Sequence, residues 1–252
     1  MNYVKVKNIR IGEGMPKICV SVTGKTDSEI LEQAKHLKGT KVDVVEWRID
    51  WYDDVFEIEK LVNILSDLRA ILSEIPLLVT FRTSVEGGEK AIDYKDYASL
   101  NKQLINTGNV DLVDIELFSG DESVKDVVKT AHEKGVKVVI SNHDFNKTPA
   151  HEEIITRLCK MQELGGDLLK IAVMPNSKKD VLTVLSATEE MYTKHASQPL
   201  ITMSMSKDGT ISRLCGEVFG SALTFGAAKK ASAPGQIGVD DLRTVLEIIH
   251  NC

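Results

Sequence analysis

Eight short runs rich in apolar and β-branched residues recur along the chain, and a longer segment with helical periodicity follows each of them. The runs are Lys17–Val22, Asp43–Arg48, Leu77–Arg82, Asp111–Glu116, Lys137–Asn142, Asp167–Ala172, Pro199–Ser204 and Ser221–Phe225. Such alternation is typical of βα units that build a parallel sheet. Eight units within 252 residues predict an α/β fold, the (β/α)8 or TIM barrel.

The segments outside these runs complete the expected architecture. Residues 1–14 alternate polar and apolar side chains with period two, which predicts a β-hairpin that closes the barrel floor. Thr26 to Glu29 has the sequence of a capping box at the start of the first helix, and Asp240–Ile249 supplies the eighth helix. No Pro-, Gly- or Ser-rich linker divides the chain, so we expect residues 1–252 to form a single domain.

An open doubly wound sheet is the alternative α/β architecture. Such a sheet normally carries a glycine-rich phosphate loop after its first strand. The residues at that point, Val22-Thr23-Gly24-Lys25, do not form the G-x-G-x-x-G pattern. The barrel is therefore favoured.

Composition narrows the class of protein. Apolar residues make up 42% and charged residues 27%, as in ordinary soluble proteins, and the net charge of −6 argues against a general nucleic-acid or anionic-membrane surface. The N-terminus has no signal-peptide h-region, and no stretch reaches the ~18 apolar residues of a membrane span. Four scattered cysteines without a C-x-x-C pair predict a cytoplasmic protein without a zinc site.

Polar residues gather where the predicted strands end. They are Glu46, Arg48, Thr80, Arg82, Asp114, Glu116, His143 and Lys170. In barrels of this class the reacting groups come from the C-terminal strand ends. Residues two apart in a strand face the same side, and inward ionisable groups are costly unless they are paired. The pattern therefore predicts a functional site at this end of the barrel.

Lys170 is the most informative of these residues, because it interrupts the apolar run Leu168–Val173. Lysine is rarely buried without a function. Burial and neighbouring cations favour the neutral amine, which attacks a ketone to form an iminium ion. The alternative is that Lys170 points outward and reaches solvent between the helices.

His143 ends the strand next to that of Lys170. Neighbouring strands lie about 4.8 Å apart, so both side chains can reach one substrate. An imidazole titrates near neutrality, which suits a group that removes a proton in one step and returns it in the next. The two residues together predict Schiff-base chemistry with acid–base assistance.

Two motifs resemble the signature of the type I 3-dehydroquinate dehydratases, the Schiff-base dehydratases of the shikimate pathway. They are Asp114–Leu117 (DIEL) and, after a spacer, Val138–Asp144 (VVISNHD). The resemblance extends over essentially the whole chain. The other segments that carry it are Glu46–Asp50, Thr80–Arg82, Glu86–Gly88, Lys170–Ala172, Ser212–Arg213 and Ser232–Gln236.

This resemblance implies a lyase that converts 3-dehydroquinate to 3-dehydroshikimate without a cofactor. It implies that Lys170 forms an imine with the C3 ketone, and that His143 removes a C2 proton and then protonates the departing C1 hydroxyl. Glu86 is implied to orient His143. It further implies a homodimer.

The resemblance also implies a substrate-binding set. Arg213 is expected to clamp the substrate carboxylate, while Glu46, Arg48 and Arg82 bind ring hydroxyls and compensate one another's charges. The loop after the last strand is expected to close over the substrate. The remaining expected members are Ser21, Met203, Phe225, Ser232 and Gln236.

Three other functions are compatible with parts of the pattern. A Schiff-base aldolase would share Lys170 but would need a substrate phosphate site. A metal-dependent hydrolase would use His143, Asp144, Glu116 and Glu46, although one histidine is few for a borderline metal. A ligand sensor with a retired active site would not need the amine and its base together.

Overall fold

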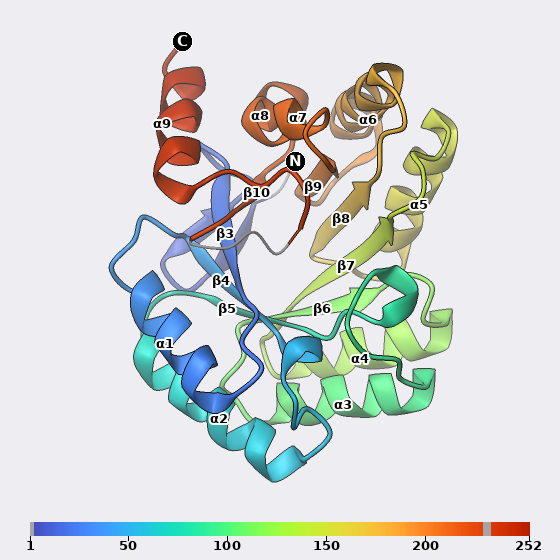
Figure 1. The fold of residues 1–252 in the computed structure, drawn as a ribbon. Coiled ribbons are helices and arrows are strands. Elements are labelled where there is room, and N and C mark those ends of the chain that lie inside the picture. Colours follow the sequence, from blue (N-terminus) through green and yellow to red (C-terminus); the bar gives the residue numbers. More distant parts are fainter. Residues whose placement is uncertain (1–2, 229–232) are drawn as a thin grey trace.

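A barrel of eight parallel strands forms the centre of the computed structural model, which describes residues 3–228 and 233–252 (Figure 1). A parallel bridge between Leu200 and Ser221 brings the two ends of the sheet together, so the barrel is nearly closed. The predicted fold class is confirmed. In sheet order the strands are β10 (Leu223–Gly226), β3 (Lys17–Val22), β4 (Val44–Arg48), β5 (Leu77–Thr80), β6 (Leu112–Glu116), β7 (Lys137–Asp144), β8 (Leu168–Val173) and β9 (Leu200–Ser204).

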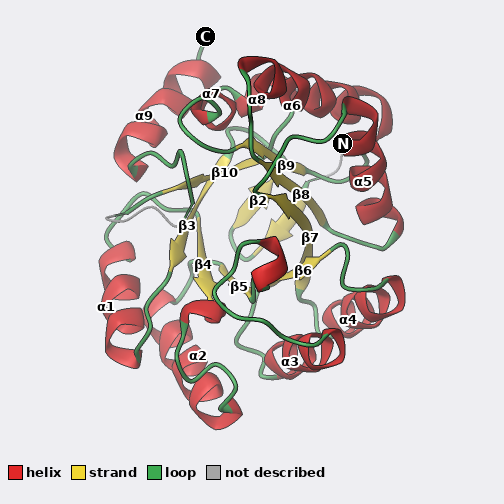
Figure 2. Ribbon diagram, turned by 45° about the vertical axis from the view of Figure 1, so that its right-hand side comes forward, coloured by secondary structure: helices red, strands yellow, loops and turns green. Residues whose placement is uncertain are grey.

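Helices surround the strands (Figure 2). The longer ones are α1 (Asp27–Leu37), α2 (Ile58–Leu72), α3 (Tyr94–Asn106), α4 (Asp121–Glu133), α5 (His151–Glu163), α6 (Lys178–Glu190) and α9 (Val239–His250). After β9 two short helices, α7 (Thr210–Leu214) and α8 (Gly216–Phe219), replace a single long one. The single turns are η1 (Ile49–Trp51), η2 (Ser84–Glu86) and the π-helical η3 (Met191–His195). None of the helices in the described ranges is long and apolar enough to cross a membrane.

The start of α1 follows its sequence signal in part. The Thr26 hydroxyl accepts a hydrogen bond from the backbone N–H of Glu29 at 3.4 Å, as an N-cap does. The Glu29 carboxylate, however, accepts from the N–H of Lys25 rather than that of Thr26. The N-cap is present and the reciprocal half of the capping box is shifted by one residue.

The expected N-terminal hairpin closes the barrel floor. Strands β1 (Val4–Val6) and β2 (Ile9–Ile11) pair antiparallel. Their apolar side chains bury against the inward-facing residues at the strand starts, including Cys19, Val44, Leu78, Leu112, Val139, Leu168, Ile201 and Leu223. The alternation of polar and apolar residues in the hairpin thus gives it one apolar face, which covers the apolar residues inside the barrel.

Aspartates fix where three strands begin. Asp43, Asp111 and Asp167 were expected inside strands, yet each lies one residue before its strand. Each carboxylate accepts a hydrogen bond from a backbone N–H of the preceding strand in the sheet, at 2.7, 2.8 and 2.9 Å from Ile18, Leu77 and Val138 respectively. The aspartate carboxylate therefore accepts the hydrogen bond that a backbone carbonyl would accept if the strand began one residue earlier.

Two strand ends also differ from expectation. Strand β5 ends at Thr80 rather than Arg82, because the Arg82 and Thr83 N–H groups donate to the carboxylates of Asp50 and Glu116 at 3.2 and 2.8 Å. Strand β7 continues through His143, which was expected just beyond the strand. His143 is consequently held by the sheet itself.

Candidate active site

The side chain of Lys170 points into the barrel. In β8, Leu168 and Ala172 pack with the inner cluster, whereas Leu169 and Ile171 pack toward the helices. Lys170 shares the inward parity, and only 4% of the residue is exposed. The alternative of an outward, solvent-reaching lysine is wrong.

The charged groups nearest to the Lys170 amine are carboxylates. Its Nζ lies 3.6 Å from Asp114 Oδ2, 3.8 Å from Glu46 Oε1 and 4.4 Å from the centre of the Phe225 ring. The expectation of neighbouring cations is therefore corrected. Two carboxylates and an aromatic face stabilise a positive nitrogen, and an iminium ion formed there would carry the same charge.

Both carboxylates beside Lys170 are held by hydroxyl groups. Glu46 accepts from Ser21 Oγ at 2.5 Å and from Thr80 Oγ1 at 2.9 Å, and Asp114 accepts from Ser141 Oγ at 2.7 Å. Complete burial alone would raise the pKa of Asp114, but the positive charges of Arg82 and Lys170 outweigh it and lower that pKa. Asp114 is thus an anion that faces the amine.

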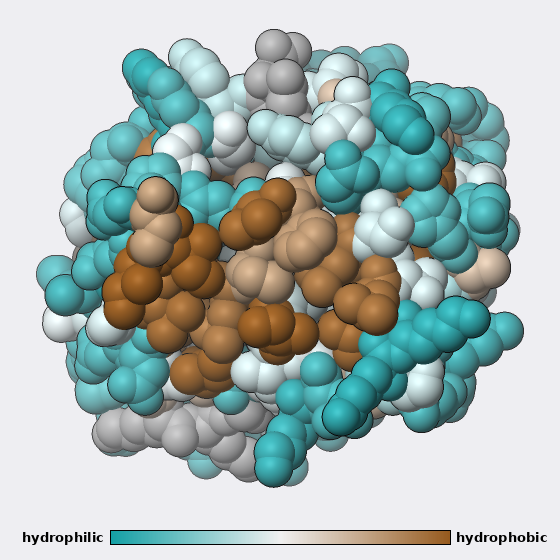
Figure 3. Space-filling view, turned by 90° about the horizontal axis from the view of Figure 1, so that it is seen from above, coloured by the Kyte–Doolittle hydropathy of each residue, from teal (hydrophilic) through white to brown (hydrophobic). Residues whose placement is uncertain are grey.

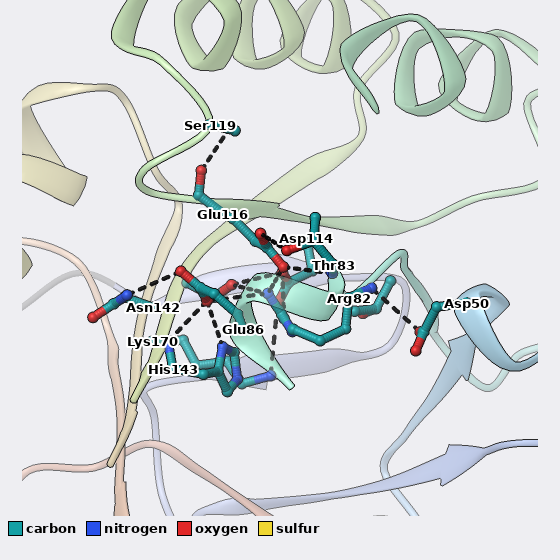
Figure 4. A network of polar contacts seen from close by, with 12 residues as sticks. Asp50, Arg82, Thr83, Glu86, Asp114, Glu116, Ser119, Asn142, His143 and Lys170 are labelled. Atoms are coloured by element: carbon teal, nitrogen blue, oxygen red, sulfur yellow. Dashed lines mark hydrogen bonds and ion pairs between the residues drawn. The ribbon is translucent and has the colours of Figure 1, made fainter. Parts of the chain in front are cut away.

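Arg82 lies at the centre of a buried charge network (Figure 4). Its guanidinium nitrogens lie 2.7 Å from Asp114, 2.9 Å from Glu116 and 3.6 Å from Glu86. Burial opposes the charge, yet these carboxylates raise the Arg82 pKa further above its ordinary value. Arg82 therefore contacts three acids at the C-terminal ends of the strands.

Glu46, Arg48 and Arg82 form no ion pairs with one another, although the charge of Glu46 favours the cationic form of Arg48 and raises its pKa. Arg48 forms two hydrogen bonds of 2.8 Å with the buried Asp50, and Arg82 pairs with other acids. Sequence spacing placed the three side chains on one face but could not assign their partners. Each cation instead has a carboxylate from its own strand end or from the following strand.

His143 and Glu86 form a hydrogen-bonded pair. His143 Nδ1 lies 3.0 Å from Glu86 Oε2, and the same oxygen accepts from the His143 backbone N–H at 2.8 Å. Burial, reinforced by the charges of Arg82, Lys170 and Arg48, holds the His143 pKa well below its ordinary value.

Neutral His143 has a defined arrangement of protons. With Nδ1–H donating to Glu86, Nε2 is left as the acceptor. Burial raises the pKa of Glu86 to about 7, although Arg82 and two hydrogen-bond donors oppose this shift. The pair can therefore gain and release one proton near neutrality.

Strand register sets the relative height of the amine and the imidazole. Lys170 is level with Ser141, and His143 is level with Ala172. The Cα of His143 thus lies two residues, roughly 6.6 Å of strand rise, nearer the barrel mouth than the Cα of Lys170, and the long lysine side chain can extend toward the mouth. A ring placed between them can meet both groups.

Arg213 is a buried cation whose charge is not balanced. It contacts Met203 Sδ and the Pro234 carbonyl, both at 3.2 Å, and no carboxylate of the described residues lies within ion-pair distance. Burial lowers its pKa to about 10, so it remains charged near neutrality. A bound carboxylate would supply the missing counter-charge.

Eleven of the twelve expected site residues line one cavity at the C-terminal ends of the strands, and Ser232 lies outside the described residues. The eleven are Ser21, Glu46, Arg48, Arg82, Glu86, His143, Lys170, Met203, Arg213, Phe225 and Gln236. The fold thus brings together residues from both ends of the chain. Further lining residues are Gly87, Phe145, Ala172, Met205 and Ala233.

Comparison with known families agrees with this geometry. The family model described as type I 3-dehydroquinase matches residues 18–252. The chain belongs to the type I 3-dehydroquinase family. The match includes all eight strands of the barrel except Lys17, the first residue of β3.

Relatives within the family cover nearly the whole chain. The 3-dehydroquinate dehydratase of Clostridioides difficile (strain 630) is 59% identical over 247 residues, which are 98% of this chain and 97% of the relative. A crystal structure of the Clostridium difficile type I enzyme with covalent modified comenic acid matches with a TM-score of 0.97, 58% identity and coverage of 100% and 99%. The Geobacillus kaustophilus enzyme matches with a TM-score of 0.96, 39% identity and the same coverage.

Some members of the site were not in the expected set. Asp114, 3.6 Å from the Lys170 amine, was noted as a strand-end residue but was not assigned to the site, although its place two residues before Glu116 signals an inward side chain. Phe145 lines the cavity from beyond β7, where strand parity gives no signal. Inward parity thus signals Asp114, whereas neither parity nor a motif signals Phe145.

The four residues proposed for a metal-dependent hydrolase do not converge. Asp144 Oδ1 accepts from the backbone N–H groups of Asn146 and Lys147, and Glu116 is bound to Arg82 and Thr83. Within the described ranges, no cluster of three or more His, Cys, Asp and Glu side chains could hold a metal ion. The acids of this family member face cations and hydroxyls instead.

Proposed function

We propose that the chain converts 3-dehydroquinate to 3-dehydroshikimate through a Schiff base on Lys170. The observation that carries this proposal is the cavity shared by a buried amine, a neutral imidazole and an arginine with no carboxylate partner among the described residues. Membership of a dehydratase family gives the reaction class.

The first stage is formation of the imine. The Lys170 amine attacks the C3 carbonyl, and the hydroxyl of the resulting carbinolamine takes up a proton and leaves as water, which gives a protonated imine. Asp114 and Glu46, both within 4 Å of Nζ, stabilise that positive charge. The iminium withdraws electrons from the adjacent carbon, so the C2 hydrogens become acidic.

The second stage is elimination. Neutral His143 takes a C2 proton on Nε2, and the C–H electron pair forms an enamine while the iminium is neutralised. The enamine electrons then expel the C1 hydroxyl, which leaves as water with the proton from His143. Hydrolysis of the conjugated imine consumes one water and releases Lys170, so one water is lost overall.

The substrate is oriented by its carboxylate. Arg213 can bind both carboxylate oxygens, which restores charge balance around a buried guanidinium. Arg48 and Glu46 line the same cavity and are assigned to the ring hydroxyls, together with Ser21 and Gln236. For Ser232 we keep the proposed substrate-binding role on the resemblance alone.

Incubation with 3-dehydroquinate tests the reaction directly. An ultraviolet enone band should appear, and borohydride reduction during turnover should leave an adduct on Lys170 alone in peptide mass maps. Lys170→Ala should give neither signal, whereas His143→Ala should give the adduct with turnover reduced about 1,000-fold. An adduct on a different lysine, or an enone band with Lys170→Ala, would contradict the proposal. Carbon–carbon cleavage without an enone band would favour the aldolase.

We also propose that the chain forms a homodimer, as the family resemblance implies. Hydrophobic side chains gather in one patch on the face that carries α6, α7, α8 and α9 (Figure 3). Exposed members of these helices are Leu182, Ile211, Val218 and Ile248, each about half exposed or more. A contiguous apolar patch of this kind marks protein interfaces, and homodimers usually pair one patch with itself.

For the cellular location, we propose the cytoplasm. Cys19, Cys159, Cys215 and Cys252 are all free thiols. Unpaired cysteines are usual in a reducing compartment. Fluorescence of a tagged chain in intact cells tests this location, and export of the chain would contradict it.

A further inference from the structure

A chain of hydrogen bonds continues from the His143–Glu86 pair to the outside of the barrel. Asn142 Nδ2 donates to Glu86 Oε1 at 2.9 Å, on the oxygen that His143 does not use (Figure 4). On its other side, Asn142 Oδ1 accepts from Arg157 Nη1 at 2.8 Å. A helix residue thus connects to the proposed base through two buried or half-buried side chains.

Strand parity puts this connection behind the cavity. Ser141 and His143 face the barrel interior, so the side chain of Asn142 lies on the opposite face of β7, toward α5. Asn142 is only 3% exposed and does not line the cavity. It cannot touch a substrate held between Lys170 and His143, and it acts through Glu86.

The two neighbours of Asn142 dictate which way its amide points. Glu86 as a carboxylate only accepts hydrogen bonds, and Arg157 only donates them. Rotating the amide by half a turn would place its oxygen against the carboxylate and its NH2 group against the guanidinium. Both hydrogen bonds would be lost and replaced by repulsion. Arg157 therefore holds the Asn142 amide in the orientation in which its NH2 group donates to Glu86.

Arg157 is itself held in place. Its Nε donates to Glu153 Oε1 at 2.8 Å, one turn earlier in α5, and its guanidinium lies 5.4 Å from the centre of the Phe118 ring. The side chain is 17% exposed. A charged hydrogen bond through a half-buried guanidinium polarises the amide and strengthens its donation to Glu86.

We propose that Asn142 and Arg157 are positioning residues for proton transfer, which favour the ionised form of Glu86 and direct its carboxylate at His143 Nδ1. This inference rests on the proposed function. Its mechanism is that an ionised, correctly oriented Glu86 fixes the His143 tautomer whose Nε2 faces the substrate.

Other charges also act on Glu86 and His143. Arg82, just after β5, favours the ionised form of Glu86 and lowers its pKa. Glu116, at the end of β6, opposes ionisation and raises that pKa. The charges of Arg82, Lys170 and Arg48 favour neutral His143. Since these groups remain in the variants below, any change in pH dependence reports the Asn142–Arg157 connection.

The test is the pH dependence of turnover in three variants. Asn142→Leu removes the hydrogen bond donated to Glu86, and Arg157→Met removes the hydrogen bond that orients the Asn142 amide. Asn142→Asp keeps the shape of the side chain and the hydrogen bond from Arg157 but places an acceptor oxygen against Glu86. Losing a donor to a carboxylate raises its pKa, so the pair becomes protonated at higher pH. The acid limb of kcat should therefore move to higher pH, most in Asn142→Asp.

The size of the effect should match one charged hydrogen bond. We expect kcat to fall about tenfold at neutral pH, with KM changed less than about twofold because no substrate contact is lost. Arg157→Lys, which keeps the charge, should recover part of the loss. The borohydride adduct on Lys170 should still form in every variant, because imine formation does not need this connection.

Arg69→Met is the matched control. Arg69 has the same 17% side-chain exposure and its own ion pair, with Asp111, but lies at the opposite end of the barrel. It should lose stability without a change in the pH profile. Acid limbs that stay at the parent position in all three variants would overturn the inference, whereas no adduct in the parent enzyme would overturn the proposed function first.

Discussion

At the residue scale, the arginines of the site differ in whether a carboxylate of the described residues pairs with them. Arg82 and Arg48 are bound to acids of the protein, whereas no described carboxylate pairs with Arg213. A buried cation without an anion is costly. Binding of a carboxylate would relieve that cost, so we propose that Arg213 allows this acidic protein to bind an anionic substrate.

Arg213→Lys tests this assignment. Lysine keeps the charge but loses the planar fork that binds two oxygens, so KM for 3-dehydroquinate should rise about tenfold or more with a smaller effect on kcat. Steady-state kinetics measure both constants. Arg10→Lys, at an exposed arginine of the hairpin, is the control and should match the parent. A KM equal to that of the parent would count against the clamp.

The short element η2 shows how a backbone turn positions Glu86. Gly87 follows it with a φ of +83°, a conformation that glycine adopts without strain. At Gly88 a Cβ would lie 1.9 Å from the carbonyl oxygen of Arg82. The Glu86-Gly87-Gly88 motif therefore has a steric reason, since larger residues would displace the carboxylate from His143.

Strand starts offer a prediction about stability at the element scale. Asp43→Ala removes the acceptor of the Ile18 N–H and the partner of Arg243, so the free energy of unfolding should fall by about 2 kcal/mol. Urea titration of the variant measures the change. Since we propose that residues 1–252 form one domain, fluorescence and circular dichroism should report a single coincident transition.

Asp126→Ala is the control for this measurement. Asp126 also pairs with a basic residue, Lys102, but it is 56% exposed and binds no backbone N–H of a neighbouring strand. Its loss should cost no more than about 0.5 kcal/mol. Equal losses in the two variants would show that the strand-start hydrogen bond contributes little.

At the scale of the whole molecule, the cavity proposed for catalysis and the patch proposed for dimer formation lie on different parts of the barrel. The cavity opens at the C-terminal ends of the strands, while the apolar patch lies over helices at the side of the barrel (Figure 3). The exposed patch residues Leu182, Ile211, Val218 and Ile248 do not line the cavity. Dimer formation and catalysis should therefore respond to different substitutions.

Paired charges on the patch should dissociate the proposed dimer. Leu182→Glu with Val218→Glu places like charges on both copies across a symmetric contact, so light scattering should report a mass near 27.8 kDa instead of twice that value. Tyr94→Glu, at an exposed aromatic residue on α3, should remain dimeric. A parent chain that is monomeric at micromolar concentration would refute the proposal.

The sequence by itself determined the order of elements, the inward parity of strand residues and the pairing of an amine with an imidazole on adjacent strands. These are local properties, because periodicity and strand adjacency follow from short stretches of chain. Eight βα units in one chain are compatible with few folds, and the closed (β/α)8 barrel is one of them. The apolar run around Lys170 and the strand end at His143 single out these two residues, and the family motifs imply their roles.

Only the tertiary structure decided which charges are partners. Glu46 faces Lys170 instead of Arg48, Arg82 gathers acids from two other segments, and Arg157 reaches Asn142 from a helix. Ion-pair energy depends on distances of a few ångströms between side chains far apart in sequence, which spacing does not encode. Barrel closure sets those distances, and with them the chemistry of the site.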